Sequence, residues 1–368
     1  MASEVHSNQF AYDEAAKPFR GLALDGGGMR GLYTANVLNA LAERFAETNR
    51  DGADFDIGRN FDLIVGASTG GILACGLAAG ISCKKLSGFH ELYGPKIFGN
   101  PVPTASPVKM AFFAWKHRST SFNSDVALRE ALHATFQDRT FASVYDDRKI
   151  ALCIPAVDMS THNAWVFKTG HLEGKHRDEN TTLVDASLAT AAAPFFFPLS
   201  FSATGNGKRP FVDGGIFANS PILIAIIEAL AITQSEPLRP IDIVSVGTCP
   251  PPAGNYADEE SRTWGLRQWQ LGKRLIEMIL DVQVSAHLFM TRMLLPHLNR
   301  RVRIIRFEQT HMPDSEAEYL GLDLATPKAI EILKRRALSD ALLIHSAAKE
   351  PGNPSAFVRD IFSSTPTL

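Results

Sequence analysis

The feature of this chain that most constrains its fold is an alternation between short, mostly apolar runs and segments with helical periodicity. A run that is apolar at consecutive positions is typical of a strand buried on both faces of a sheet. These runs are Arg20–Asp25, Phe61–Gly66, Ile150–Val157, Ala164–Lys168, Pro210–Asp213, Ile241–Gly247 and Val302–Phe307. We therefore predict an α/β fold: a three-layer sandwich with a central, mostly parallel sheet covered by helices on both faces.

The length of 368 residues suits one large domain. Residues 1–17 are polar and mixed in charge, and we expect a flexible N-terminal leader there. We predict a single domain over residues 18–348 and a C-terminal tail over 349–368. Lysine and arginine total 37 against 39 aspartates and glutamates, a net charge of −2. This balance argues against a nucleic-acid partner held by bulk charge. The sequence leaves the oligomeric state open.

Cysteine usage and hydropathy bear on where the protein works. The 4 cysteines include no C-x-x-C pair, which favours buried thiols in a reducing compartment. The N-terminus has no apolar signal-peptide core. The most apolar stretch, residues 221–232, is about half the ~20 residues that a membrane span needs. We expect a cytoplasmic protein that meets a membrane from one side only.

The first motif is the glycine-rich loop Asp25-Gly26-Gly27-Gly28-Met29-Arg30-Gly31, between a predicted strand and a predicted helix. Consecutive glycines let backbone N–H groups approach an anion, and a helix N-terminus adds positive charge. The loop also fits the dinucleotide pattern G-x-G-x-x-G. That pattern needs an acidic residue about 20 positions further on, at the end of the next strand. Here the next strand comes later and ends differently.

That strand ends in the second motif, Gly66-Ala67-Ser68-Thr69-Gly70, which precedes an apolar helix pattern. G-x-S-x-G between a strand and a helix is typical of a nucleophile elbow, a sharp turn that exposes the serine hydroxyl. A plain tight turn is the alternative. In this context we predict that Ser68 is a nucleophile.

The third motif, Asp213-Gly214-Gly215, ends another predicted strand. Asp-Gly alone usually marks a turn. The three motifs together offer oxyanion donors, a nucleophile and a carboxylate, which is the equipment of acyl transfer.

These residues resemble the patatin-like phospholipase family, whose pattern is a glycine-rich loop with arginine, a G-x-S-x-G serine and an Asp-Gly-Gly aspartate, in that order. Further stretches agree, although Ser220 replaces the second asparagine of the family's Asn-Asn-Pro. These stretches are 187–198, 217–221 and 322–327. Some bacterial members, including antiviral effectors activated by cyclic nucleotides, are similar in length and in residues 30–35.

The resemblance implies a catalytic dyad of Ser68 and Asp213 that hydrolyses acyl esters of membrane phospholipids without calcium. We expect no cofactor and no metal ion. The backbone amides of Gly27, Gly28 and Met29 are the predicted oxyanion donors. The remaining motif residues are predicted to support them: Asp25, Gly26, Arg30, Gly31, Gly66, Gly70, Gly214 and Gly215. The implied partners are a phospholipid membrane, contacted peripherally, and a small nucleotide activator.

Burial against Phe195–Phe197 would raise the basicity of Asp213.

The role of Arg30 and the identity of the catalytic base stay open. Arg30 would support the oxyanion loop, bind a lipid phosphate, or pair with Asp25 or another carboxylate. A rival triad, Ser68–Asp213–His311, follows the chain order of α/β-hydrolases and makes the histidine the base. Rival functions are a nucleotide sensor that binds phosphate on the glycine loop, and an inactive lipid-binding protein.

Three further segments attract attention. Residues 110–118 combine aromatic and basic side chains, which suits either an interfacial segment or a core helix. The stretch 264–295 resembles a long helix whose basic residues would suit a regulatory site. His171–His176 lacks H-E-x-x-H spacing, and its polar surroundings indicate a solvated loop.

Overall fold

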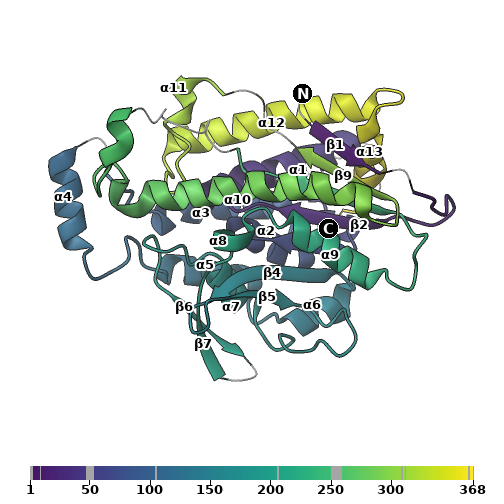
Figure 1. Cartoon of the computed structure of the whole chain (residues 1–368), viewed down its shortest axis with the longest axis horizontal. Helices are drawn as coiled ribbons and strands as arrows, with labels where there is room; N and C mark the ends of the chain where they lie inside the picture. Colours follow the sequence, from purple (N-terminus) through teal and green to yellow (C-terminus); the bar gives the residue numbers. More distant parts are fainter. Residues whose placement is uncertain are drawn as a thin grey trace.

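The computed structural model describes residues 3–8, 10–46, 54–103, 106–204, 207–249, 259–307, 310, 312–363 and 365–367. Within these ranges one sheet forms the centre and helices pack on both of its faces (Figure 1). The strands are β1 (Ser3–Ser7), β2 (Phe19–Leu24), β3 (Leu63–Gly66), β4 (Ala151–Asp158), β5 (Asn163–Lys168), β6 (Ser200–Thr204), β7 (Gly207–Asp213), β8 (Ile241–Val246) and β9 (Val302–Phe307). The helices are α1 (Gly31–Phe45), α2 (Thr69–Ala78), α3 (Cys83–Ile97), α4 (Pro107–Lys116), α5 (Val126–Phe136), α6 (Phe141–Arg148), α7 (Leu183–Thr190), α8 (Gly215–Ala218), α9 (Ile222–Ile232), α10 (Lys273–Leu294), α11 (Asp314–Ala317), α12 (Pro327–Lys349) and α13 (Phe357–Phe362).

The sheet is parallel at its centre and antiparallel at its margins. Its order is β1-β9-β8-β2-β3-β4-β7-β6, with β5 also paired to β4. The pairs that join β9, β8, β2, β3 and β4 are all parallel. In contrast, β1, β5, β6 and β7 each join the sheet antiparallel. The parallel centre brings the carboxyl ends of β2 and β3 to the same edge of the sheet.

Both faces of the parallel centre of the sheet are buried, as the apolar runs predict, whereas β5 and the start of β7 are partly exposed. In β2, Leu22 and Leu24 pack into a core with α1, α2, α3 and α12, while Ala23 faces a second core with α9. Ile64 and Val65 of β3 divide between the two cores in the same way. The predicted three-layer α/β sandwich is therefore confirmed.

The two chain ends belong to this sandwich. Ser3–Ser7 pair with β9, so this part of the segment 1–17 is an edge strand, and the prediction of a flexible leader is wrong there. An edge strand pairs on one side only and does not need an apolar run, which is why the sequence pattern gave no signal. Near the other end, α13 buries Phe357, Val358, Ile361 and Phe362 in the core, so the segment 349–368 also packs on the domain.

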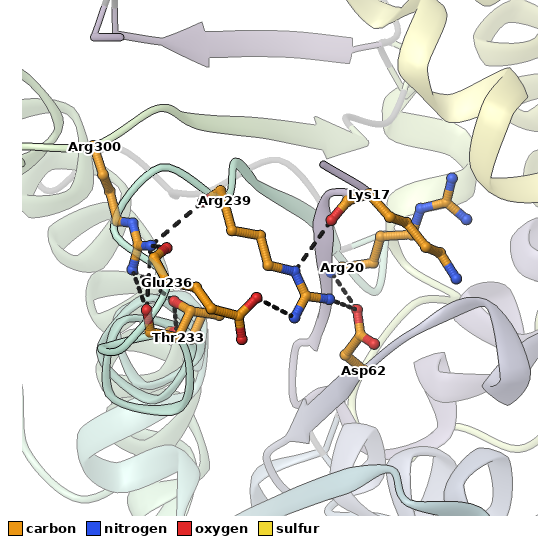
Figure 2. Close-up of polar contacts among 8 residues, drawn as sticks. Lys17, Arg20, Asp62, Thr233, Glu236, Arg239 and Arg300 are labelled. Carbon is orange, nitrogen blue, oxygen red and sulfur yellow. Dashed lines mark hydrogen bonds and ion pairs between the residues drawn. The ribbon is translucent and has the colours of Figure 1, made fainter. Parts of the chain in front are cut away.

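A polar network closes the edge of the sheet where the parallel strands begin (Figure 2). Arg239 donates to the Lys17 carbonyl oxygen at 3.1 Å and forms ion pairs with Asp62 and Glu236. Asp62 also accepts the backbone N–H of Arg20 at 2.8 Å. These bonds link the start of β2 to the residue that precedes β3.

The helix α10 crosses the molecule lengthwise on the outside of the fold (Figure 1). The segment Gln270–His297 is long and apolar enough to span a membrane by length and composition, with a mean hydropathy of 1.2 in its most apolar stretch and only 17% of that stretch buried. The expectation from residues 221–232 overlooked this helix, because its apolar residues are interrupted by charged ones.

Candidate active site

Ser68 occupies the sharp turn between β3 and α2. Its backbone angles are φ 52° and ψ −126°, a conformation that is strained for a residue with a side chain. The Ser68 N–H donates to Thr190 Oγ1 at 2.9 Å, and the Thr190 hydroxyl donates to the Pro155 carbonyl at 2.6 Å. Thr190 therefore anchors the turn to β4. This positioning residue was missed by sequence analysis, although it lies in the stretch 187–198 that resembles the family.

Asp213 lies at the end of β7 and contacts Ser68 directly. The Ser68 hydroxyl donates to Asp213 Oδ2 at 2.7 Å, across 145 residues of sequence. The Gly215 N–H donates to the other carboxylate oxygen, also at 2.7 Å. The two side chains predicted to form the dyad are thus brought together, and both carboxylate oxygens of Asp213 are fixed.

Burial changes the chemistry of this carboxylate. Desolvation raises the pKa of Asp213 to about 7, against the opposing effect of the hydrogen bonds from Ser68 and Gly215. A carboxylate with such a pKa is a far better proton acceptor near neutral pH than an exposed aspartate. Phe196 and Phe197 line the cavity that Asp213 faces, as predicted, but Phe195 is 50% exposed and points away from the core.

The glycine-rich loop lies against the serine. A Cβ atom on Gly26 would come within 2.9 Å of Ser68 Cβ, so only glycine permits this approach. Among the described residues, the N–H groups of Gly27 and Gly28 have no hydrogen-bond partner, and Gly28 lines the cavity at Ser68. Both amides are available to an oxyanion.

Met29 does not fit its predicted role as an oxyanion donor. Its N–H donates to the Leu322 carbonyl at 2.9 Å, and its side chain is buried in the core. The prediction is therefore wrong for this structure, because the loop turns at Gly28 (φ 57°) and sends the next amide toward Leu322.

The other motif residues support the site by close packing and charge. At five further glycines of the motifs, an added Cβ atom would clash with a neighbouring group. The clashing pairs are Gly31 with the Thr69 side chain, Gly66 with the Gly70 carbonyl, Gly70 with the Leu24 carbonyl, Gly214 with the Pro155 carbonyl, and Gly215 with the Leu280 side chain. Asp25 accepts a hydrogen bond from Arg306 Nη2 at 2.5 Å. This salt bridge ties the start of the loop to β9.

Arg30 is buried beneath α10. Burial lowers the pKa of its guanidinium, and the nearby carboxylates of Asp281 and Glu277 act in the opposite direction. Its Nε donates to the Gly27 carbonyl at 3.3 Å, so Arg30 braces the loop from within. Since Asp25 pairs with Arg306, the carboxylates near Arg30 are those of α10, which the sequence did not connect to the loop.

A narrow apolar cavity of ≈ 60 Å³ opens beside Ser68 and Asp213. It has room for roughly four to six waters at about 10–15 Å³ each. His90 is the histidine that lines it, and it was missed by sequence analysis. Its Nδ1 donates to the Leu86 carbonyl, and its Nε2 lies 3.0 Å from the Thr69 hydroxyl. Burial lowers the pKa of His90, so the ring is neutral.

Two other predictions concern histidines. His311, the base of the rival triad, lies outside the described residues. The segment 171–176 is a loop whose residues 173–176 are exposed, as predicted, but the His171 side chain is only 2% exposed and its Nε2 lies 3.1 Å from Glu228. Cys153, His171 and Glu228 could approach one metal ion, but Glu228 is already paired with Lys168 as well. Glu228 is therefore the buried partner of an ion pair with Lys168.

A strained serine after β3, free backbone amides after β2 and a buried aspartate at the end of the antiparallel strand β7 have the geometry of a serine hydrolase site. Residues 22–226 match the family model described as patatin-like phospholipase, and all three motifs fall within this range. The chain belongs to the patatin-like phospholipase family, as the motifs predict.

Individual relatives carry more specific names. A cGAMP-activated phospholipase of Pseudomonas aeruginosa is 32% identical over 333 residues, which cover 90% of this chain and 89% of the relative. A cGAMP-activated phospholipase of Vibrio cholerae is 30% identical, over 88% of this chain and 91% of the relative. A cUMP-AMP-activated phospholipase of Escherichia coli is 26% identical, over 73% and 75% respectively.

Proposed function

We propose that this protein is a calcium-independent serine acyl hydrolase of the phospholipase A type, which cleaves fatty acyl esters of membrane phospholipids through Ser68 and Asp213. The observation that carries the proposal is the 2.7 Å hydrogen bond from the Ser68 hydroxyl to the buried Asp213 carboxylate. Family membership supports the lipid substrate.

The geometry supports a two-step mechanism. Asp213 Oδ2 accepts the hydroxyl proton as Ser68 Oγ attacks the ester carbonyl, and the amides of Gly27 and Gly28 stabilise the resulting oxyanion. Asp213 then donates the proton to the departing alcohol oxygen, which leaves an acyl-serine ester. In the second step Asp213 takes a proton from water, the hydroxide oxygen attacks the acyl carbon, and Ser68 recovers its proton as the fatty acid leaves.

The direct contact of Ser68 with Asp213 favours this dyad over the triad with His311. In a triad the imidazole lies between the serine and the carboxylate and bonds to both. Here the two oxygens are already at hydrogen-bond distance, so no ring fits between them. The activity of a His311→Ala variant separates the two mechanisms.

The relatives support a nucleotide-regulated enzyme. Because the similar proteins named above are activated by cGAMP or cUMP-AMP, we infer that a cyclic nucleotide activates this protein as well. The resemblance further supports a cytoplasmic role in antiviral defence. The glycine loop is a poor candidate for the nucleotide site, since Gly26 is packed against Ser68.

The segment 110–118 supports peripheral membrane contact. In α4, Phe112 is 63% and Trp115 62% exposed, and Arg118 stacks on the Trp115 ring at 5.0 Å. This helix projects from one end of the molecule (Figure 1). Exposed rings beside a cation suit the headgroup level of a bilayer better than a protein core.

Two measurements test the proposed function. A fluorophosphonate probe should label the wild-type protein at Ser68, and Ser68→Ala should abolish the labelling. Lipid mass spectrometry of a membrane extract, with the inferred cyclic dinucleotide present, should detect released fatty acids with the wild type but not with Asp213→Ala. A folded protein that is neither labelled nor active would support the lipid-binding or nucleotide-sensing alternatives instead.

A further inference from the structure

The helix α10 has apolar residues on both sides: Ile276 and Leu280 are buried in the core, and a second apolar set faces solvent. We define its outer face by six residues that are 39–61% exposed: Leu275, Met278, Val282, Phe289, Met290 and Met293. In a surface helix of a globular protein these positions would be polar. A continuous apolar stripe of this kind on a protein surface marks an interaction site.

The inner face of α10 makes polar contacts with the segment that follows Asp213. The Gln283 side chain donates to the Ile216 carbonyl at 3.1 Å, and His287 Nδ1 donates to the Ser220 carbonyl at 2.8 Å. Asn219 Nδ2 donates to the Leu280 carbonyl at 3.2 Å. Leu280 itself lines the cavity at Ser68, so α10 forms a cover over the catalytic serine.

The charges on the inner face argue against a membrane-spanning α10. Lys273 is buried and pairs with Asp323 at 2.6 Å. Glu277 and Asp281 lie near the buried Arg30. A helix that spanned a bilayer would have to carry these charges into hydrocarbon, which is strongly unfavourable.

The composition of the exposed surface identifies a lipid bilayer as the partner. Arg292 is the charged residue among the fully exposed residues of 270–297, and the acidic Glu277 is only 31% exposed and lies toward Lys273. Just before α10, Trp264 packs edge-on to Trp269, and Arg274 stacks on Trp264 at 4.7 Å. Leu266 beside them is 77% exposed. Tryptophan and arginine next to an apolar stripe are typical of helices that lie in the headgroup region of a membrane.

We propose that the outer face of α10 docks on the surface of an anionic phospholipid bilayer and so places the serine cavity next to its substrate. The proposal rests on the proposed phospholipase function. Because α10 lines the cavity beside Ser68 through Leu280, docking of its outer face brings the cavity close to the lipid surface.

The experiment compares two charged variants of matched design. Met278→Glu with Met293→Glu alters the outer face of α10. Leu338→Glu with Leu342→Glu alters α12, where the two leucines are 49% and 46% exposed. Sedimentation with vesicles of phosphatidylcholine and phosphatidylglycerol should show binding reduced at least tenfold for the α10 variant and unchanged for the α12 variant. A third variant, Val282→Trp, should bind the vesicles more tightly than the wild type.

The outcomes are distinct. Vesicle binding of the α10 variant equal to that of the wild type would overturn the proposal. If the wild type is a dimer and only the α10 variant dissociates, a second copy of the chain covers this face. If the wild type stays on the vesicles through alkaline extraction, α10 spans the bilayer. Either result would contradict the proposal. Failure of the wild type to react with a soluble fluorophosphonate would instead count against the phospholipase function.

Discussion

The hydroxyl oxygen of Thr190 accepts the backbone N–H of Ser68 at 2.9 Å, although 122 residues separate them. This bond holds a strained turn, and Thr190→Val removes the bond while keeping the shape of the side chain. The buried N–H would then lack a partner, which costs about 1–3 kcal/mol. We expect kcat to fall about tenfold or more with KM nearly unchanged, since the serine loses its orientation.

Thr291→Val is the matched control for Thr190→Val. Thr291 is buried too, but its hydroxyl has no hydrogen-bond partner among the described residues. We expect wild-type kcat and stability from this variant. Equal losses in both variants, measured by steady-state kinetics and urea unfolding, would show that Thr190 acts only through packing.

Activity should rise with pH near neutrality. Asp213 must be ionised to accept the Ser68 proton, and burial raises its pKa to about 7. The rate should therefore climb as the pH rises through about 7 and level off above it. A pH profile of kcat/KM on a soluble ester measures this. A rate that is already level at pH 5 would mean that Asp213 is ionised far below neutrality.

The same pKa predicts a pH-dependent effect of Asp213→Asn on stability. Between pH 3.8 and about 7 the folded carboxyl keeps a proton that the unfolded chain has lost, so wild-type stability declines as the pH rises through this range. The neutral amide avoids that loss. At pH 8 the variant should be more stable than the wild type, by up to about 4 kcal/mol, and the gap should shrink toward pH 5. Urea unfolding at both pH values checks this, and a gap independent of pH would contradict it.

Gly28→Ala should abolish most activity. At φ 57° an alanine is strained, and its Cβ would lie 2.3 Å from the Leu322 carbonyl oxygen, so the oxyanion loop must shift. One misplaced oxyanion donor typically costs ~10²–10³ in kcat. Gly352→Ala is the control, because Gly352 also has a positive φ of 77° but nothing lies within 4 Å of the added atom. Similar kcat values for the two variants would argue against the assigned role of the loop.

His311→Ala distinguishes the dyad from the triad. If Asp213 is the base, the variant keeps most of its activity, whereas Asp213→Ala loses at least about a thousandfold. Burst kinetics with a chromogenic ester measure both values. Parallel loss of activity in the two variants would establish the triad.

Local patterns predicted the fold and the dyad well. The predicted run Val302–Phe307 coincides with β9, and the predicted runs Arg20–Asp25 and Phe61–Gly66 overlap β2 and β3. Ser68 and Asp213 each follow such a run, but β7 pairs antiparallel with β4, so their meeting was implied by the family resemblance and not by the order of parallel strands. The edge strand β6 escaped, because its buried serines alternate with exposed residues and carry no apolar signal.

What escaped prediction depends on contacts between distant segments. The N–H of Met29 turns away because Leu322, nearly 300 positions later, supplies a carbonyl. The neutral state of His90 arises from burial against Thr69, and the pairing of Asp25 with Arg306 depends on the position of β9. No local spacing encodes these contacts.

The position of Arg30 has a consequence for the opening of the site. Its positive charge is buried near two carboxylates that belong to α10 rather than to the loop. Lifting α10 would separate these charges and leave a guanidinium in need of an anion. A phosphate group that enters with the substrate has the required charge, so the headgroup of the lipid could replace Asp281 and Glu277 as it arrives. The cost of opening would then be lowest when substrate is present.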